Sequence, residues 1–199
     1  MDHSTSTSPQ LSFEGLAEKK PTDRLFFALF PDTEAAARVA GLARSLREEH
    51  GLHGQPLRED RLHVTLHHLG DYAGVPQDVV AKAGQAATRM AIAVFEVVFD
   101  SVSSFSGRSR NHPFVLRGDQ GLASLVAMQV ELGKHMKAAG LAPWVEGNFT
   151  PHVTLLYDHR SVAPQPVEPI AWTAREFVLV HSELGQTRHH VLGRWPLRA

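Results

Sequence analysis

The chain has 199 residues, 43% hydrophobic and 21% charged, as is ordinary for one globular domain or two small lobes with a shared core. Its 20 Lys and Arg against 21 Asp and Glu exclude the general electrostatic attraction by which basic proteins bind long nucleic acid or a DNA duplex. A nucleic-acid partner would have to be bound locally, at one end of the nucleic acid or at a single nucleotide. The absence of cysteine excludes disulfides, thiolate metal sites and cysteine nucleophiles, and is compatible with a reducing cytoplasm, where we expect the protein.

The N-terminal region predicts neither a secretory signal nor a membrane anchor. Residues 1–22 are rich in Ser, Thr and Lys with few apolar residues, so we expect a disordered tail followed by a single folded domain over 23–199. The longest apolar stretch, MAIAVFEVVF, carries Glu96 and is too short to cross a bilayer. We therefore expect a soluble protein with no membrane partner.

The predicted elements alternate between short apolar strands and amphipathic helices. In chain order we predict a strand over 24–30, a helix over 33–51, a strand over 61–70, a helix over 76–91, strands over 93–105 and 114–118, a helix over 121–140, a strand over 149–158, a Pro-rich connector over 162–169, and closing strands over 175–184 and 189–197. The interleaved order with several hairpin-like connections favours an α+β fold with an antiparallel sheet over a doubly wound parallel sheet.

The tetrapeptide His-Val-Thr-Leu occurs twice, in RLHVTLHHLG and in FTPHVTLLYD. Because side chains alternate across a strand, one face is predicted to carry His63, Thr65, His67, His152, Thr154 and Leu156. The opposite face is predicted to carry Val64, Leu66, His68, Val153 and Leu155. Val and Leu can then fill a core while His and Thr face a common groove.

Two histidines and two threonines on one groove fit the opening of a cyclic phosphodiester. In-line displacement needs a base that deprotonates water and an acid that protonates the departing oxygen, and histidine serves in either role near neutral pH. Threonine hydroxyls can donate hydrogen bonds to the non-bridging phosphate oxygens. The alternative interpretation is a structural strand that was duplicated without a catalytic role.

A metal site is a second alternative. His63 and His67 are predicted to share a strand face, and three more histidines are candidates to join them as ligands, namely His159, His189 and His190. The motifs themselves contain no carboxylate, and the nearest are Asp71 and Asp158. We therefore expect no metal in the reaction.

These residues resemble the 2H phosphoesterase superfamily, which has two His-x-Thr/Ser motifs, and within it the bacterial RNA 2′,3′-cyclic phosphodiesterase group, also called 2′-5′ RNA ligase-like. RLFFALFPD resembles the opening strand of the family, LHVTLHHLGD its first motif and FTPHVTL its second. FVLVHSEL and LGRWPL resemble its closing strands. Together these segments cover most of residues 24–198 in the expected order.

The resemblance implies a bilobal α+β fold, in which two pseudo-symmetric lobes of antiparallel sheet plus helices surround a central groove. It implies that His63 and His152 are the catalytic acid–base pair and that Thr65 and Thr154 bind the phosphate. The implied reaction opens a 2′,3′-cyclic phosphate to a 2′-phosphate without any cofactor. We assign His152 as the base and His63 as the acid, and the order of the two strands leaves the reverse assignment open.

The sequence departs from the family at three positions. Relatives often carry an aromatic residue where this chain has His68 and an Arg where it has Tyr157, and His189 stands where a Tyr is common. An aromatic residue can stack on a base and an Arg can hold a phosphate, so these changes bear on RNA binding. We take His67, His68 and Tyr157 as candidate substrate-binding residues.

Arginines near the motifs are further candidates. Arg108 and Arg110 in SGRSRNHP can reach a substrate phosphate from a loop, although loop arginines are more often simply solvated. Arg58 and Arg61, just before the first motif, have the same two interpretations. Core packing is the expected role of the aromatic residues Phe26, Phe30 and Trp195.

The expected partners are RNA 3′ ends or small cyclic nucleotides, bound by a monomer. Three other functions fit the same motifs: 2′-5′ RNA ligation, hydrolysis of another phosphoester such as a 2′-5′ linkage or ADP-ribose cyclic phosphate, and binding of nucleotides or RNA ends without turnover. The presence of both histidines and both threonines argues against binding without turnover.

Overall fold

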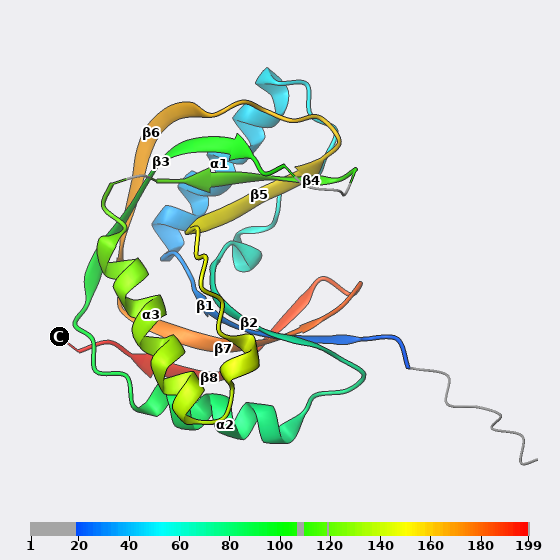
Figure 1. The fold of residues 1–199 in the computed structure, drawn as a ribbon. Helices are drawn as coiled ribbons and strands as arrows, with labels where there is room; N and C mark the ends of the chain where they lie inside the picture. The colour runs from blue at the N-terminus through cyan, green and yellow to red at the C-terminus, as the bar shows by residue number, and fades with distance from the viewer. Residues whose placement is uncertain (1–18, 107–109, 119, 199) are drawn as a thin grey trace, which may run out of the picture.

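Eight strands form one sheet in the part of the chain that the structure, a computed structural model, describes: residues 19–106, 110–118 and 120–198 (Figure 1). The strands are β1 (Asp23–Leu29), β2 (Val64–Tyr72), β3 (Phe95–Ser104), β4 (His112–Arg117), β5 (His152–Asp158), β6 (Gln165–Ala174), β7 (Glu176–Glu183) and β8 (Arg188–Pro196). Their order across the sheet is β6-β3-β4-β5-β2-β1-β7-β8, and neighbouring strands pair antiparallel. The predicted α+β class with an antiparallel sheet is confirmed.

The sheet divides into two four-stranded halves that meet at β2 and β5. We call β2-β1-β7-β8 the β2 lobe and β5-β4-β3-β6 the β5 lobe. The β2 lobe forms the lower half of the molecule in Figure 1 and the β5 lobe the upper half. Each lobe is paired along the length of its strands, whereas β2 and β5 pair only at Val64 and Val153. The predicted bilobal arrangement, with one motif strand from each lobe, is confirmed.

The helices tie the two lobes together. The structure describes three α-helices, α1 (Thr33–Glu49), α2 (Gln77–Thr88) and α3 (Ala123–Ala138), and two short 3₁₀ helices, η1 (Glu59–Arg61) and η2 (Ala142–Trp144). Asp32 caps α1, since its carboxylate accepts a hydrogen bond from the Ala35 N–H at 2.8 Å. Helix α1 follows β1 but packs against β5 and β6, and α3 follows β4 but packs against α2, β2 and β3. Each of these two connections therefore carries the chain across the junction.

The hydrophobic core runs through both lobes. One buried cluster includes Phe27 and Val64 of the β2 lobe together with Phe99 and Val153 of the β5 lobe. A smaller cluster, formed by Phe26, Ala28, Val178 and Val180, belongs to the β2 lobe. Because the larger cluster is continuous across the junction, the two motif strands are held by the same packing.

The Pro-rich connector expected over 162–169 is wrong from residue 165 onward, because residues 165–174 form strand β6. Its neighbour is β3, and β6 lies at the edge of the sheet. Proline lacks a backbone N–H and is tolerated where one side of a strand has no partner. Pro166 can therefore pair opposite Ser101 at the sheet edge, a placement that composition alone does not reveal.

Of the predicted tail, residues 1–22, the first 18 lie outside the described residues. Its last residue, Thr22, joins the sheet, since its N–H donates to the Tyr72 carbonyl and its carbonyl accepts from the Leu184 N–H, both at 2.8 Å. No helix within the described ranges has the length and apolar character needed to cross a membrane.

Candidate active site

The two His-Val-Thr-Leu segments meet at the junction of the lobes. Val64 of β2 and Val153 of β5 are paired and completely buried in the core. The residues on either side of each valine point to the opposite face, since side chains alternate along a strand. Because the strands are antiparallel, His63 lies on the same side of this pair as Thr154, and Thr65 on the same side as His152. The junction thus forms a pseudo-symmetric arrangement of two His and two Thr side chains.

A β-bulge follows the threonine in both strands and corrects the predicted alternation. In β2, Phe27 pairs with His67 and Ala28 pairs with Thr65, which leaves Leu66 without an opposite residue. In β5, Phe114 pairs with Leu156 and Val115 with Thr154, which leaves Leu155 without one. An extra residue in one strand reverses the direction of the side chains that come after it. Both strands therefore change faces at equivalent positions.

The bulge removes His67 from the groove and brings His68 into it. His67 is 1% exposed and contacts the Gln129 carbonyl of α3 through Nε2 at 2.9 Å, so its predicted place on the catalytic face is wrong. Leu156, predicted to share that face with His152, is likewise buried. His68 and Tyr157 occupy the equivalent positions in β2 and β5, and both line the groove. The two candidate residues that depart from the family pattern thus face the space between the lobes.

The groove between the lobes has a volume of about 740 Å³. Both lobes and the segment before β5 contribute to its lining, which consists of Arg24, Phe26, Leu57, Arg61, His63, Thr65, Leu66, His68, Phe105, Glu146, Asn148, Phe149, Thr150, His152, Thr154, Tyr157, Ser182 and His189. All four residues predicted for catalysis and phosphate binding are in this set. The fold therefore brings His63, Thr65, His152 and Thr154 together in one cavity.

The two histidines are held in the same way. The Nδ1 atom of His63 lies 2.7 Å from the Arg61 carbonyl, and Nδ1 of His152 lies 2.8 Å from the Thr150 carbonyl. A carbonyl only accepts hydrogen bonds, so Nδ1 carries a proton in both rings. The Nε2 atom of each ring then holds the lone pair when the ring is neutral and a proton when it is charged. Both rings are thereby prepared for proton transfer at Nε2.

An aromatic ring supports each histidine. Phe26 of β1 stacks on His63 with ring centroids 4.9 Å apart, and Phe105, after β3, meets His152 edge-on at 4.8 Å. Phe26 is 4% exposed, so its expected core role is consistent with the structure, but it also forms the floor beneath His63. No local sequence signal marks Phe105, which the tertiary structure places beside His152.

Burial and nearby positive charge favour the neutral form of both histidines. Burial lowers the pKa of His63 to about 4, and the hydrogen bond to the Arg61 carbonyl opposes this effect. The positive charge of Arg61, and that of His189 when its ring is protonated, lower the pKa further. Burial also lowers the pKa of His152, with a smaller contribution from Arg117 on the adjacent strand β4. In the free protein, His63 is the more strongly affected of the pair.

His189 and Arg61 complete the wall around His63. The His189 ring lies 5.5 Å from the His63 ring, and its Nε2 is 3.3 Å from a terminal nitrogen of the Arg61 guanidinium. The arginine donates, so the Nε2 atom of His189 accepts and the ring is neutral. Burial and the charge of Arg61 lower the pKa of His189 to about 4. A departure from the family pattern thus forms part of the groove.

The remaining candidate arginines separate into different places. Arg108 lies outside the described residues. Arg110 is exposed and is not part of the groove lining. Arg58 pairs with Asp60 at the surface, which leaves Arg61 as the groove-lining arginine of this predicted set.

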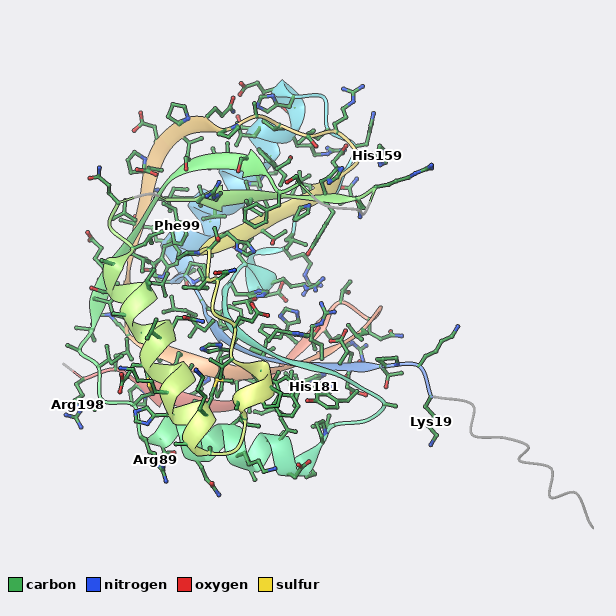
Figure 2. The ribbon with its side chains drawn as sticks, viewed as in Figure 1. Lys19, Arg89, Phe99, His159, His181 and Arg198 are labelled. Atoms are coloured by element: carbon green, nitrogen blue, oxygen red, sulfur yellow. The ribbon has the colours of Figure 1, made fainter. Side chains whose placement is uncertain are left out.

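The five histidines considered for a metal site do not converge on one point, although His63 and His189 are neighbours. His67 is buried beneath the groove, and His159 lies at the outer end of the β5 lobe (Figure 2). His190 contacts a carboxylate oxygen of Glu183 at 2.7 Å. Across residues 19–106, 110–118 and 120–198, no three His, Cys, Asp or Glu side chains are grouped so that they could hold a metal ion.

A model of the 2′-5′ RNA ligase superfamily matches residues 30–186. The chain belongs to this family. Its two motifs thus identify a 2H phosphoesterase, the superfamily that the sequence resembles, and place it among phosphoester-acting enzymes. A search of curated protein sequences gave no significant match.

Solved structures of other proteins share the fold. Escherichia coli LigT complexed with 3′-AMP is 26% identical, with a TM-score of 0.68 over 90% of this chain and 99% of that one. LigT complexed with ATP is 25% identical, with a TM-score of 0.66 over 90% of this chain and 100% of that one. The protein TT0787 of Thermus thermophilus is 22% identical, with a TM-score of 0.68 over 88% of this chain and 98% of that one. The similarity to TT0787 is a similarity of fold.

Proposed function

We propose that the protein hydrolyses the 2′,3′-cyclic phosphate ends of RNA or nucleotides to 2′-phosphates with no metal ion. The observation that carries the proposal is the matched pair of His63 and His152. Each comes from a different lobe, donates through Nδ1 to the carbonyl two residues earlier, and lies in one groove with Thr65 and Thr154. The two nucleotide complexes of LigT support a nucleotide as the ligand of this groove.

The proposed step is an in-line displacement at phosphorus. One histidine takes a proton from water at Nε2, the water oxygen forms a bond to phosphorus, and the bond between phosphorus and the ribose 3′-oxygen breaks. The second histidine gives its Nε2 proton to that 3′-oxygen, so the product carries a 2′-phosphate and a free 3′-hydroxyl. The Thr65 and Thr154 hydroxyls donate hydrogen bonds to the non-bridging oxygens as charge develops on them.

The environment of the two rings favours His63 as the base and His152 as the acid, the reverse of the sequence-based assignment. A base must be neutral, and burial beside Arg61 and His189 lowers the pKa of His63 to about 4. An acid must hold a proton, and the less strongly affected His152 gains one more readily when the phosphate anion binds beside it.

The central experiment measures turnover of nucleoside 2′,3′-cyclic monophosphates in the presence of EDTA. We expect a 2′-phosphate product and a loss of about 1,000-fold in kcat/KM in both His63→Ala and His152→Ala, the range for removal of an acid–base catalyst. His135→Ala is the matched control, since His135 lies on α3 outside the groove lining and contacts Glu131. This control should retain wild-type turnover.

Each other outcome selects a different function. EDTA-sensitive turnover would indicate a metal-dependent hydrolase. Joining of a cyclic-phosphate end to a 5′-hydroxyl end, faster than hydrolysis, would indicate a ligase. Absence of turnover on cyclic phosphates and on 2′-5′ linkages, with tight binding of a nucleotide, would indicate a binding protein and contradict the proposal.

A substrate with sulfur in place of the bridging 3′-oxygen separates the acid from the base. A thiolate leaves without a proton, so loss of the acid costs much less with this substrate while loss of the base costs the same. With this substrate, we expect the loss of kcat/KM in His152→Ala to be about 100-fold smaller than with the ordinary substrate. The loss in His63→Ala should be unchanged. Rescue of His63→Ala instead would restore the sequence-based assignment.

A further inference from the structure

We infer that the groove continues across the β5 lobe as a binding site for the ribose-phosphate backbone of single-stranded RNA, centred on Arg117. This site would receive the nucleotides that precede the terminal cyclic phosphate, so the inference rests on the proposed function and specifies its substrate as an oligoribonucleotide. Three features of β4, β3 and β6 carry it: a row of paired residues beside His152, an arginine without a carboxylate partner, and a second cavity.

A row of residues leads away from His152 across the sheet. Arg117 of β4 pairs directly with His152, Ser101 of β3 pairs with Arg117, and Pro166 of β6 pairs with Ser101. Directly paired residues point to the same face of a sheet, so this row continues the face that carries the catalytic histidine. Strands are about 4.8 Å apart, and three spacings give a row of about 14 Å. A nucleotide chain advances about 3.4 Å per residue when its bases stack, so two or more nucleotides fit along the row.

Arg117 has the bonding capacity that a phosphate would use. Arg24 pairs with Asp71 and Arg58 with Asp60, whereas the groove-lining Arg61 contacts the neutral ring of His189. In the described part of the chain, Arg117 makes no ion pair; its guanidinium lies 5.6 Å from the centre of the Phe105 ring, and one terminal nitrogen is 3.5 Å from the Ser103 hydroxyl. A guanidinium has five N–H donors in a fork that matches phosphate oxygens. Most of these donors have no acceptor among the described residues.

A second cavity of about 340 Å³ lies on the far side of Arg117 from the catalytic groove. Its lining is Asp100, Ser101, Val102, Ser103, Arg117, Pro164, Gln165 and Pro166. Phe105, in contact with Arg117, lines the catalytic groove, so the pair separates the two cavities. A cation, a carboxylate and hydroxyls in one cavity suit a ligand with both phosphate and hydroxyl groups. Asp100 has no paired residue on β6, because the register of β3 and β6 shifts between Phe99 and Ser101. Its carboxylate can accept a hydrogen bond from a ribose 2′-hydroxyl, the group that distinguishes RNA from DNA.

The test compares a mononucleotide with a trinucleotide, both ending in a 2′,3′-cyclic phosphate. In the wild type we expect kcat/KM to be higher for the trinucleotide, and in Arg117→Gln we expect this preference to fall about tenfold, as for loss of one charge-assisted hydrogen bond. The salt dependence should change as well, because one phosphate contact contributes a slope of about 0.7 in the logarithmic salt plot for a single strand. Arg89→Gln is the matched control; Arg89 is exposed at the end of α2, away from the β5 lobe (Figure 2).

An unchanged preference and an unchanged salt slope in Arg117→Gln would overturn the inference, even with the proposed hydrolysis intact. The affinity of oligonucleotides that end in a 3′-phosphate is measured in parallel, because it needs no turnover. If no cyclic phosphate is hydrolysed but Arg117→Gln selectively weakens the trinucleotide 3′-phosphate, the site stands and the proposed function fails. Replacement of the penultimate ribose by deoxyribose should reduce affinity in the wild type but not in Asp100→Ala, which has no side-chain acceptor. An equal loss in both proteins would contradict the role of Asp100.

Discussion

Acidification from pH 7 to pH 4 should destabilise the folded protein through His63. Burial lowers the folded-state pKa of His63 to about 4, against an ordinary value of 6.5 for the unfolded chain. Between these values the unfolded chain binds a proton that the folded protein does not, so stability is fully present above pH 6.5 and is lost as the pH falls through about 4. A shift from 6.5 to about 4 corresponds to about 3 kcal/mol, at 1.36 kcal/mol per pKa unit.

The measurement is urea-induced unfolding at several pH values between 7 and 4, for the wild type and for His63→Gln. Glutamine does not titrate, so we expect the free energy of unfolding of the variant to fall by about 3 kcal/mol less across this range. The His63 ring resonances in an NMR titration give the pKa directly, and removal of the neighbouring positive charge in Arg61→Gln should raise it.

Parallel stability curves for the wild type and His63→Gln would refute this reasoning. So would an NMR pKa near 6.5 for His63, because burial against Phe26 at 4.9 Å could not then cost what the structure implies. Either result would also remove the argument for His63 as the base.

Three further predictions concern positions that hold the motif strands, each measured by urea unfolding. Gly54→Ala should destabilise the fold by about 3 kcal/mol, because a Cβ atom there would lie 2.0 Å from the Tyr157 carbonyl oxygen. Gly84→Ala on α2 is the control and should not destabilise it, because the added Cβ would meet no other segment within 4 Å. Equal stability of the two variants would contradict the close approach at Gly54. His67→Ala should cost about 2 kcal/mol through the lost hydrogen bond to α3 and the cavity left behind, and a neutral result would mean that the buried ring is not packed as described. Asp158→Asn should lower the free energy of unfolding by about 2 kcal/mol, because the buried carboxylate accepts hydrogen bonds from three backbone N–H groups. The difference between variant and wild type should shrink as the pH falls toward about 2, where the carboxylate takes up a proton. A difference that stays constant over this range would exclude the carboxylate as the cause.

The main elements could be predicted from local sequence because their signals are local. The helices have apolar residues at helical spacing, and most strands are short apolar runs bounded by turn residues. Strand β6 could not be predicted, because proline at position 166 is compatible with a strand only through its place at the sheet edge. The predicted alternation after Thr65 and Thr154 failed for a related reason, since the bulges arise from pairing with β1 and β4.

The candidate site divides in the same way. His63, Thr65, His152 and Thr154 were predicted from the repeated tetrapeptide, which needs only the two-residue period of a strand to separate core side chains from groove side chains. The partners of these residues come from distant segments. Phe105 and Arg117 lie beside His152 only through the sheet, and a charged residue at the end of the apolar strand FVLRG was the one signal that could have drawn attention to Arg117.

The sequence by itself determined the strands, the two motifs and the chemistry that their side chains can perform, because residue type and periodicity are properties of a short segment. Only the tertiary structure decided which histidines share the groove, since a bulge in each motif strand turns His67 into the core and His68 toward the groove. It also decided the electrostatic difference between His63 and His152, because a pKa depends on burial and on charges brought close by chain segments far apart in sequence.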